Sequence, residues 1–187
     1  MADCVGPIPV LETERLILRP FRRDDAEAAH AIYGDPEVMH YSVSGPFGTI
    51  ETTAAHLDDH IRREAEHGYA FRAIIERRSD RLIGVGGLVP MPPPWQAIEV
   101  GYRICRDRWG EGFATEATLV WLNAGFRYFG LDQILAVVEA ANVASVRVVE
   151  KCGMCAEGEA DYKGVAVRKF AAYKRDWNST VFGRSAE

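Results

Sequence analysis

The sequence predicts an α/β protein in which a mixed, mostly antiparallel central sheet is flanked by helices. Segments of alternating polar and apolar residues, typical of half-buried strands, are interspersed with segments whose apolar residues recur every three or four positions, typical of amphipathic helices. Their order implies one mixed sheet with helices on its faces. With 187 residues, 48% of them hydrophobic, the chain fits a single compact domain, predicted over residues 11–177 between tails at 1–10 and 178–187.

The first elements are a strand and a helix. Residues 15–19 alternate between polar and apolar side chains, and Pro20 follows this strand. Asp24 and Asp25 then open a helix, because acidic residues suit a helix amino terminus, and Gly34 ends it.

A longer helix and three consecutive strands come next. Apolar residues at three- and four-residue spacing predict the helix over 49–67, with Gly68 as its cap. Strand-like runs at 69–76, 82–89 and 97–104 are separated by a turn and a proline-rich loop, so we expect a meander.

The second half of the chain begins with its most regular helix. An apolar stripe over 113–128, ended by Gly130, predicts this element. The remaining expected elements are a β-branched strand at 134–138, a helix at 143–152, and closing strands from Met154 onward and at 165–174.

Charge and composition exclude several classes of protein. The formal net charge is −5 and no run of five like charges occurs, so no nucleic-acid partner is expected. The longest uncharged stretch, residues 82–98, carries prolines that would break a spanning helix, so no membrane segment is expected. The amino terminus lacks the features of a secretory signal and the 4 cysteines suggest no disulfide framework, which together predict a cytoplasmic protein.

Two small clusters raise the alternative of metal or redox chemistry. Cys152 and Cys155 form a C-x-x-C pair at a helix carboxyl end, which disfavours a thiolate, so ordinary packing is favoured over redox or zinc chemistry. His56 and His60 lie four residues apart beside Asp59, but no glutamate follows His56 as a zincin motif requires. We therefore expect a solvated helix face and no metal.

The segment from Tyr102 to Glu116 is the most informative. A strand runs into a turn that contains Gly110 and Gly112, and a helix begins at once. Glycine lets the backbone approach a ligand closely, and the free N–H groups of a helix start favour an anion. Neither the G-x-G-x-x-G nor the G-K-[ST] phosphate pattern is present, so a tight turn without a ligand is the alternative.

A second informative segment runs from Glu139 to Ser145, where a short apolar strand leads into a helix. Asn142 stands at the start of that helix, and an ordinary N-cap is its alternative role. The short segments that can be compared with known families are Thr13-Glu14-Arg15-Leu16-Ile17-Leu18-Arg19-Pro20 with Asp24-Asp25, Asp35-Pro36-Glu37-Val38, Ile98-Glu99-Val100-Gly101-Tyr102, Trp109-Gly110-Glu111-Gly112-Phe113-Ala114-Thr115-Glu116-Ala117, Asn142-Val143-Ala144-Ser145 and Glu150-Lys151-Cys152-Gly153-Met154.

Taken in this order, these segments resemble the GNAT superfamily of acetyl-CoA-dependent N-acetyltransferases. The resemblance is closest to the branch with the ribosomal-protein N-terminal acetyltransferases RimJ and RimL, and it extends over residues 11–177. It implies the GNAT fold, in which two central strands splay apart at the cofactor site.

The resemblance implies an acetyl-CoA site. The superfamily's pyrophosphate loop, [Q/R]-x-x-G-x-[G/A], matches with Gly112 in its fourth position and Ala114 in its sixth. Trp109 departs from the general pattern in the first position, although an aromatic residue is common there in the RimJ/RimL-like branch. The implied cofactor-binding residues are Tyr102, Arg103 and Ile104 along the pantetheine; Trp109, Gly110, Glu111, Gly112, Phe113, Ala114 and Thr115 at the pyrophosphate; Asn142 on the pantetheine; Ser145 toward the thioester; and Lys151 or Arg108 at the 3′-phosphate.

Catalytic groups are implied in the same way. Glu99 is the candidate base, acting through water, and a solvated or ion-paired carboxylate is its alternative reading. Many members have a tyrosine that acts as the general acid seven residues after the asparagine, but Val149 stands at that position here. Ser145 is then the nearest matched hydroxyl for the leaving thiolate, unless it bonds back to its own helix. A strand bulge near Ile104 is expected to direct an N–H group at the thioester carbonyl.

The sequence therefore predicts transfer of an acetyl group from acetyl-CoA to a primary amine by direct attack in a ternary complex. A protein or peptide amino terminus is the leading acceptor, because an α-amine with a pKa of about 7.7–8.0 is neutral far more often than a lysine amine. A small amine such as an antibiotic, polyamine or amino acid is the alternative acceptor, and a non-catalytic acyl-CoA sensor is the alternative function. His40, Tyr41 and Glu51 are candidate substrate contacts, and a homodimer is left open.

Overall fold

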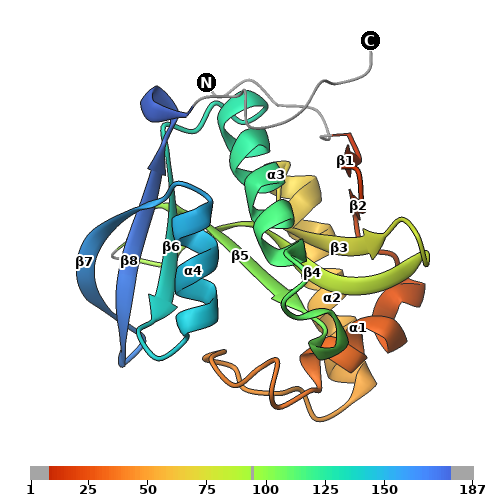
Figure 1. Ribbon diagram of the computed structural model, residues 1–187. Helices are drawn as coiled ribbons and strands as arrows, with labels where there is room; N and C mark the ends of the chain where they lie inside the picture. The colour runs from red at the N-terminus through yellow and green to blue at the C-terminus, as the bar shows by residue number, and fades with distance from the viewer. Residues whose placement is uncertain (1–8, 94, 178–187) are drawn as a thin grey trace.

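An eight-stranded sheet runs through the computed structural model, which describes residues 9–93 and 95–177 (Figure 1). Its strands lie in the order β1-β2-β3-β4-β5-β6-β8-β7. Every neighbouring pair is antiparallel except β5 and β6, which are parallel, so the expected mixed, mostly antiparallel sheet is confirmed. The strand bounds are β1 Leu11–Glu12, β2 Leu16–Arg19, β3 Phe71–Glu76, β4 Arg81–Pro90, β5 Ile98–Ile104, β6 Gln133–Glu139, β7 Cys155–Tyr162 and β8 Val165–Tyr173.

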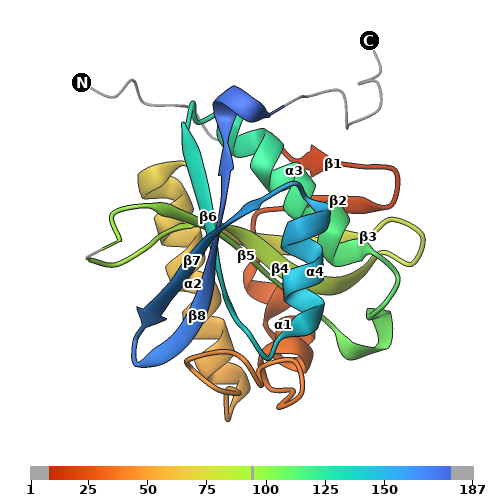
Figure 2. The same cartoon turned by 60° about the vertical axis from the view of Figure 1, so that its left-hand side comes forward.

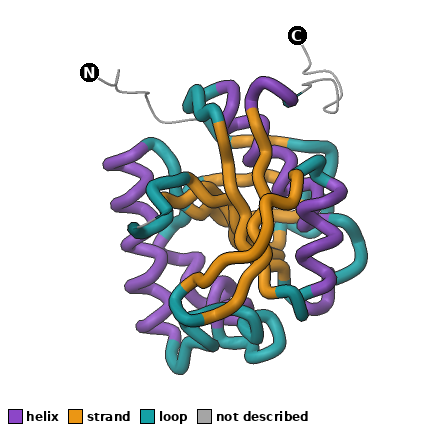
Figure 3. The backbone as a smooth tube through the Cα atoms, turned by 90° about the vertical axis from the view of Figure 1, so that its left-hand side faces the viewer, coloured by secondary structure: helices purple, strands orange, loops and turns teal. Residues whose placement is uncertain are grey.

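Helices cover both faces of this sheet (Figures 2 and 3). One face is covered by α1 and α2, and the other by α3 and α4. The helix bounds are α1 Ala26–Tyr33, α2 Ile50–His67, α3 Phe113–Arg127 and α4 Val143–Lys151. Short 3-10 turns precede α1 at Arg23–Asp25 and α3 at Arg106–Arg108.

The strands divide their side chains between two large hydrophobic cores and a third, smaller cluster of Met91, Leu135 and Ala171. Successive residues of a strand point to opposite faces, so Ile74 packs into the core under α3 and α4 while Ala73 and Ile75 pack into the core under α1 and α2. Trp121 is fully buried in the first core and Tyr33 in the second. A residue's parity along a strand therefore decides which helices its side chain faces.

Local signals placed most element ends correctly. Thr49 is the N-cap of α2 and its hydroxyl accepts a hydrogen bond from the Thr52 backbone N–H at 3.2 Å. Gly68 ends the same helix at φ 82°, in the left-handed region that favours glycine. The strand β1 was not predicted, because two residues are too few to show a period.

The expectation of a solvated face for His56 and His60 is wrong. His60 is buried and its ring stacks on Phe71 at a centroid distance of 5.2 Å, while His56 is half-buried against Tyr33. The two Nε2 atoms lie 3.2 Å apart, and burial lowers the pKa of His60 to about 3. These rings continue the inward stripe of α2 set by Leu57, so they pack on the sheet as neutral groups. Within residues 9–93 and 95–177 no cluster of side chains could hold a metal ion.

The C-x-x-C pair is divided between the interior and the surface. Cys152 is buried, and burial raises its pKa to about 12, whereas Cys155 is exposed. This fits packing better than redox chemistry. In the part of the chain that the structure describes, no helix combines the length and apolar character needed to cross a membrane. Nearly all of the tails predicted at 1–10 and 178–187 lie outside the described residues.

Candidate active site

The parallel strands β5 and β6 touch at one point and then diverge. Their pairing is confined to Glu99 and Leu135. Beyond that point the two arrows in Figure 1 separate toward their carboxyl ends, with α4 beside β6. A gap between two central strands leaves backbone groups without a ladder partner, so this is the place in the sheet where a ligand can bind to the main chain.

The N–H groups of Tyr102 and Ile104 face this gap. Cys105 donates its N–H to the Ile83 carbonyl at 2.8 Å, so the odd-numbered residues of β5 bond to β4. The even-numbered residues then direct their N–H groups toward β6, which has already diverged. The expected bulge near Ile104 is wrong, because the β4–β5 register runs without a shift from Gly84 and Ile104 to its end. A regular strand beside a departing neighbour supplies the same free donors.

The turn before α3 opens a second set of backbone donors. Gly110 and Gly112 have φ values of 82° and 84°, which any other residue would adopt at a cost of about 1–2 kcal/mol. Gly112 is the N-cap of α3, and no side chain caps this helix start. The first-turn N–H groups, including those of Ala114 and Thr115, have no partner within the helix and suit an anion.

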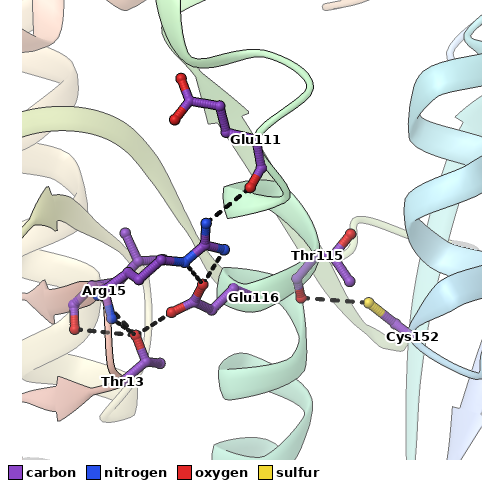
Figure 4. Close-up of polar contacts among 7 residues, drawn as sticks. Thr13, Arg15, Glu111, Thr115, Glu116 and Cys152 are labelled. Atoms are coloured by element: carbon purple, nitrogen blue, oxygen red, sulfur yellow. Dashed lines mark hydrogen bonds and ion pairs between the residues drawn. The ribbon is translucent and has the colours of Figure 1, made fainter.

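Arg15 holds this turn in place, as Figure 4 shows. Its Nη1 donates to the Glu111 carbonyl at 2.9 Å and its Nε to the Glu116 carboxylate at 2.7 Å. The guanidinium lies 4.4 Å from the centroid of the Phe113 ring, and a Cβ on Gly112 would lie 3.6 Å from its Nη2. Sequence patterns placed Arg15 only as a strand residue; its position in the first family-like segment was the available signal.

Trp109 and Arg108 brace the turn from the strand side. The Trp109 indole donates its Nε1–H to the Ile104 carbonyl at 2.8 Å, which ties the turn to the end of β5. The Arg108 guanidinium forms an ion pair with Glu76 at 3.5 Å and with Asp107 at 3.4 Å. The side chain of Arg108 is therefore occupied by carboxylates.

The carboxyl end of α4 lies against the first turn of α3. The Sγ of Cys152 donates to the Thr115 carbonyl at 3.6 Å, a contact drawn in Figure 4. Lys151, the residue before it, is exposed and forms no ion pair with a described residue. Lys151 is therefore a cation without an ion pair among the described residues, one position before the contact between Cys152 and the first turn of α3.

Tyr102 of β5 and Ser145 of α4 contact each other across the gap that β5 and β6 leave. The Tyr102 hydroxyl donates to the Ser145 Oγ at 3.1 Å, so the partner of Ser145 is across the gap rather than in its own helix. Asn142 is the N-cap of α4, and its Oδ1 accepts the Ser145 N–H at 3.1 Å. The Nδ2 group of Asn142 remains as a donor. Val149 is buried in the core, so the position of the missing tyrosine carries no hydroxyl, and Ser145 is the hydroxyl of α4 that lies at the gap.

Glu99 stands at the fork on the opposite face of β5. Burial raises the pKa of its carboxyl to about 7, although the Arg103 guanidinium, the Val137 backbone N–H and Lys163 each act to lower it. The Val137 contact places the carboxylate at the divergence of β5 and β6. A half-buried carboxyl with this pKa can take up and release a proton near neutral pH.

The candidate substrate residues are only partly brought to this site. The Tyr41 hydroxyl donates to the Ala141 carbonyl at 3.2 Å, beside Asn142, and His40 packs edge-on against the Tyr41 ring at 4.6 Å. Glu51 is exposed in the first turn of α2, where its own backbone N–H and then the Thr49 side chain lower its pKa. That carboxylate serves the helix start and contacts none of the other candidates.

Arg103 differs from its neighbours on β5 in the direction of its side chain. Its backbone lies along the gap, but its guanidinium lies on the face covered by α1 and α2, where Nη2 donates to the Ser42 Oγ at 3.0 Å. The residues gathered around the gap are Glu99, Tyr102, Ile104, Trp109, Gly110, Gly112, Ala114, Thr115, Asn142 and Ser145, with Arg15 as an addition.

Comparisons with known proteins show the family and the fold to which the chain is similar. The model of the acetyltransferase (GNAT) domain matches residues 15–155. The uncharacterized N-acetyltransferase YoaA of Bacillus subtilis is 36% identical over 158 residues, which are 80% of this chain and 85% of that protein. A GNAT-family acetyltransferase from Bacillus anthracis has a crystal structure with a TM-score of 0.78 and 25% identity, covering 90% of this chain and 100% of its own. RimL, described as a ribosomal L7/L12 alpha-N-protein acetyltransferase in complex with coenzyme A, shares the fold with a TM-score of 0.76 and 19% identity over 88% of this chain and 98% of its own.

Proposed function

The chain belongs to the acetyltransferase (GNAT) family, and we propose that its domain, residues 11–177, transfers an acetyl group from acetyl-CoA to a primary amine by direct attack in a ternary complex. The observation that carries the proposal is the gap between β5 and β6. It presents unpaired backbone donors beside the start of α3, with Glu99 on one side and Ser145 on the other.

The donors around the gap fit the polar groups of an acyl-CoA. The first turn of α3 and Gly112 suit a pyrophosphate, and Arg15, which is paired with Glu116, holds the turn in place through the Glu111 carbonyl. The N–H groups of Tyr102 and Ile104 and the amide of Asn142 suit the pantetheine amides. When bound, acetyl-CoA supplies an acetyl thioester whose sulfur is the leaving group.

Lys151 is the better candidate for the 3′-phosphate. It is exposed next to the first turn of α3 and carries no ion pair with a described residue, whereas Arg108 is already paired with Glu76. A phosphate would have to compete with a carboxylate for Arg108 but not for Lys151.

Glu99 would accept the proton of the attacking amine through a water molecule. Its pKa of about 7 lies just below that of an α-amine, about 7.7–8.0, and far below that of a lysine amine, about 10.4. General-base catalysis is most efficient when the pKa of the base lies near the pH at which the enzyme works. This favours an acceptor whose amine is neutral in appreciable amount, and we propose the amino terminus of a protein or peptide, as in the RimJ/RimL-like branch.

Ser145 would hold the proton that the leaving sulfur takes. Its hydroxyl accepts from Tyr102 and keeps its own O–H free to donate into the gap. Burial raises the pKa of Tyr102 to about 12, so Tyr102 stays protonated and continues to donate to Ser145. The two hydroxyls form a short donor chain that points at the gap from the face opposite Glu99.

Two measurements on the wild-type protein test the proposal. Calorimetric titration with acetyl-CoA should give micromolar affinity, and mass spectrometry should then detect an acetyl group on one of a panel of peptides with free amino termini. Matched peptides with blocked amino termini but free lysines, and small amines such as spermidine, serve as the comparison. Absence of binding at millimolar acetyl-CoA would overturn the enzyme assignment; acetylation of small amines alone would overturn the peptide acceptor.

A further inference from the structure

Arg103 is a half-buried cation whose side chain lies on the face of β5 that α1 and α2 cover. Its guanidinium lies 5.5 Å from the centroid of the Tyr33 ring and 5.7 Å from that of Phe71. Its Nε donates to the Met39 sulfur at 3.1 Å and its Nη2 to the Ser42 hydroxyl at 3.0 Å. All of these partners are neutral.

The charge of Arg103 is not neutralised by a carboxylate. Among the other arginines shielded from solvent, Arg19 is paired with Asp25, Arg72 with Glu64 and Arg108 with Glu76, whereas Arg168 has no ion pair with a described residue. Arg103 forms no ion pair with any residue of 9–93 or 95–177, although the chain holds 27 acidic residues. A shielded guanidinium that contacts only neutral groups is strongly predisposed to bind an anion.

Glu99 and Arg103 lie on the same face of the same strand, four residues apart. Their Cα atoms are therefore about 13 Å apart, and their charged groups form no ion pair with each other. Gly101 stands between them, and a Cβ there would lie 2.9 Å from Cζ of Phe71. The edge of the Phe71 ring therefore lies between the carboxylate and the guanidinium, so a small molecule could span the two groups across an apolar surface.

The hydroxyl of Tyr33 is a second polar group in this region without a partner. It is fully buried and forms no hydrogen bond with a described residue. Burial raises the pKa of Tyr33 to about 12, so the hydroxyl remains a donor. A buried hydroxyl without a hydrogen bond destabilises the protein, and a bound acceptor atom would remove that cost.

We propose that Arg103, assisted by the Tyr33 hydroxyl, binds a negatively charged group carried by the same molecule as the acceptor amine. The inference rests on the proposed function, because Glu99 places the amine. It narrows the acceptor to an amine that also bears an acid, with a carboxylate as the chemistry that best fits a guanidinium fork. Such a carboxylate belongs either to a free amino acid or to an acidic residue at the amino terminus of a peptide.

Pairs of acceptors that differ only in an acid and its amide test the proposal. Alanine and alaninamide form the amino-acid arm, and the tripeptide amides Glu-Ala-Ala and Gln-Ala-Ala form the peptide arm. In at least one arm, kcat/KM per neutral amine should be about 10-fold higher for the acid, as expected for one shielded ion pair. The arm that shows the preference identifies the source of the carboxylate.

Variants at Arg103 assign the preference to its guanidinium. Arg103→Met should reduce the acid-to-amide ratio to about 1, and Arg103→Lys should retain part of it. Arg168→Met is the matched control, because Arg168 is also half-buried, lies 5.1 Å over the Phe170 ring and forms no ion pair with a described residue. That variant should keep the full ratio. Thermal unfolding and acetyl-CoA affinity show whether each variant is folded, and if Arg103→Met does not fold, the wild-type ratio and Arg103→Lys decide.

The outcomes separate this inference from the proposed function. Equal kcat/KM for acid and amide in both arms, or an unchanged ratio in Arg103→Met, would overturn the acidic acceptor while leaving the acetyltransferase intact. No acetylation of these or any other amines by a protein that binds acetyl-CoA would overturn the proposed function, and this inference with it.

Discussion

Protonation of Glu99 should slow the reaction as the pH falls through neutrality. Burial raises the pKa of this carboxyl to about 7, so its folded-state base form is lost below that pH. The carboxylate fraction is about 0.9 at pH 8 and about 0.1 at pH 6, since each pH unit is a tenfold change in the proton concentration. After correction for the neutral fraction of the amine, kcat/KM should therefore fall about 10-fold over this interval. Arg103 lowers the pKa of Glu99, so Arg103→Met should move the midpoint to higher pH.

The assay measures kcat/KM from the release of the coenzyme A thiol between about pH 6 and about pH 9. The pH dependence of kcat/KM gives the pKa values of essential groups in the free enzyme. Glu99→Gln should give a profile without this inflection and a rate about 100-fold lower at the upper end, with unchanged affinity for acetyl-CoA. A wild-type profile that is flat after correction, or an identical profile for Glu99→Gln, would refute the role of Glu99 as the base.

The same substitution should stabilise the fold at alkaline pH, which separates loss of chemistry from loss of structure. A carboxyl whose folded-state pKa is raised stabilises the protein while it is protonated, and this contribution is lost as the pH rises through about 7. A change from 4.5 to about 7 corresponds to about 3 kcal/mol at most. Glu99→Gln should therefore raise the unfolding free energy in urea by up to that amount at pH 8 and by little near pH 4. A loss of stability at pH 8 would contradict the burial argument.

Three further predictions concern the acetyl-CoA site. Gly112→Asp should weaken acetyl-CoA binding by about 10-fold or more in calorimetry. Gly130→Asp is the control, because Gly130 has a left-handed φ of 64° and open space around it, and it should leave binding unchanged. Equal effects of the two variants would contradict the placement of the pyrophosphate. Tyr102→Phe should lower kcat about 10-fold without changing acetyl-CoA affinity, and Ser145→Ala should lower it at least as much; an unchanged kcat in Tyr102→Phe would show that Ser145 acts without it. Arg15→Met should raise the KM for acetyl-CoA about 10-fold, because it releases the Glu111 carbonyl and with it the turn before α3. An unchanged KM would show that Arg15 does not support cofactor binding.

Periodicity predicted most of the fold because many elements bury one side more fully than the other. Along β2, Leu16 and Leu18 are buried while Ile17 and Arg19 are half-buried, and α3 places its apolar stripe in the core. The element that escaped was β1, which pairs through Leu11 and Glu12 only. His60 was wrongly predicted to be exposed to solvent. A histidine at helical spacing is equally compatible with a solvent-exposed helix face and with a buried ring that stacks on Phe71.

The turn before α3 was predictable from the sequence, but the contacts that hold it in place were not. Gly110 and Gly112 predict a turn with positive φ at a helix start, because two closely spaced glycines are a local property of the sequence. Arg15 reaches the same turn from a position about a hundred residues earlier, so its hydrogen bond to the Glu111 carbonyl follows only from the tertiary fold. The tie between Trp109 and the Ile104 carbonyl likewise depends on where β5 ends. The direction of the Arg103 side chain could have been predicted, since Arg103 shares its parity with Glu99.

That parity also explains how one strand can serve two halves of a reaction. Even-numbered Tyr102 faces α4 and reaches Ser145, while odd-numbered Glu99 and Arg103 lie on the opposite face. There Arg103 contacts Ser42 after α1, and Glu99 lies beside the Val137 N–H of β6. In a continuous sheet the backbone would separate these two sets of groups completely. The divergence of β6 after Leu135 removes that barrier at one point. In the proposed mechanism, an amine would approach the thioester carbonyl carbon from the Glu99 side, and the thioester sulfur would meet Ser145 on the other side. The acidic acceptor inferred from Arg103 and the cofactor held by α3 would therefore meet through the sheet rather than on one surface of it.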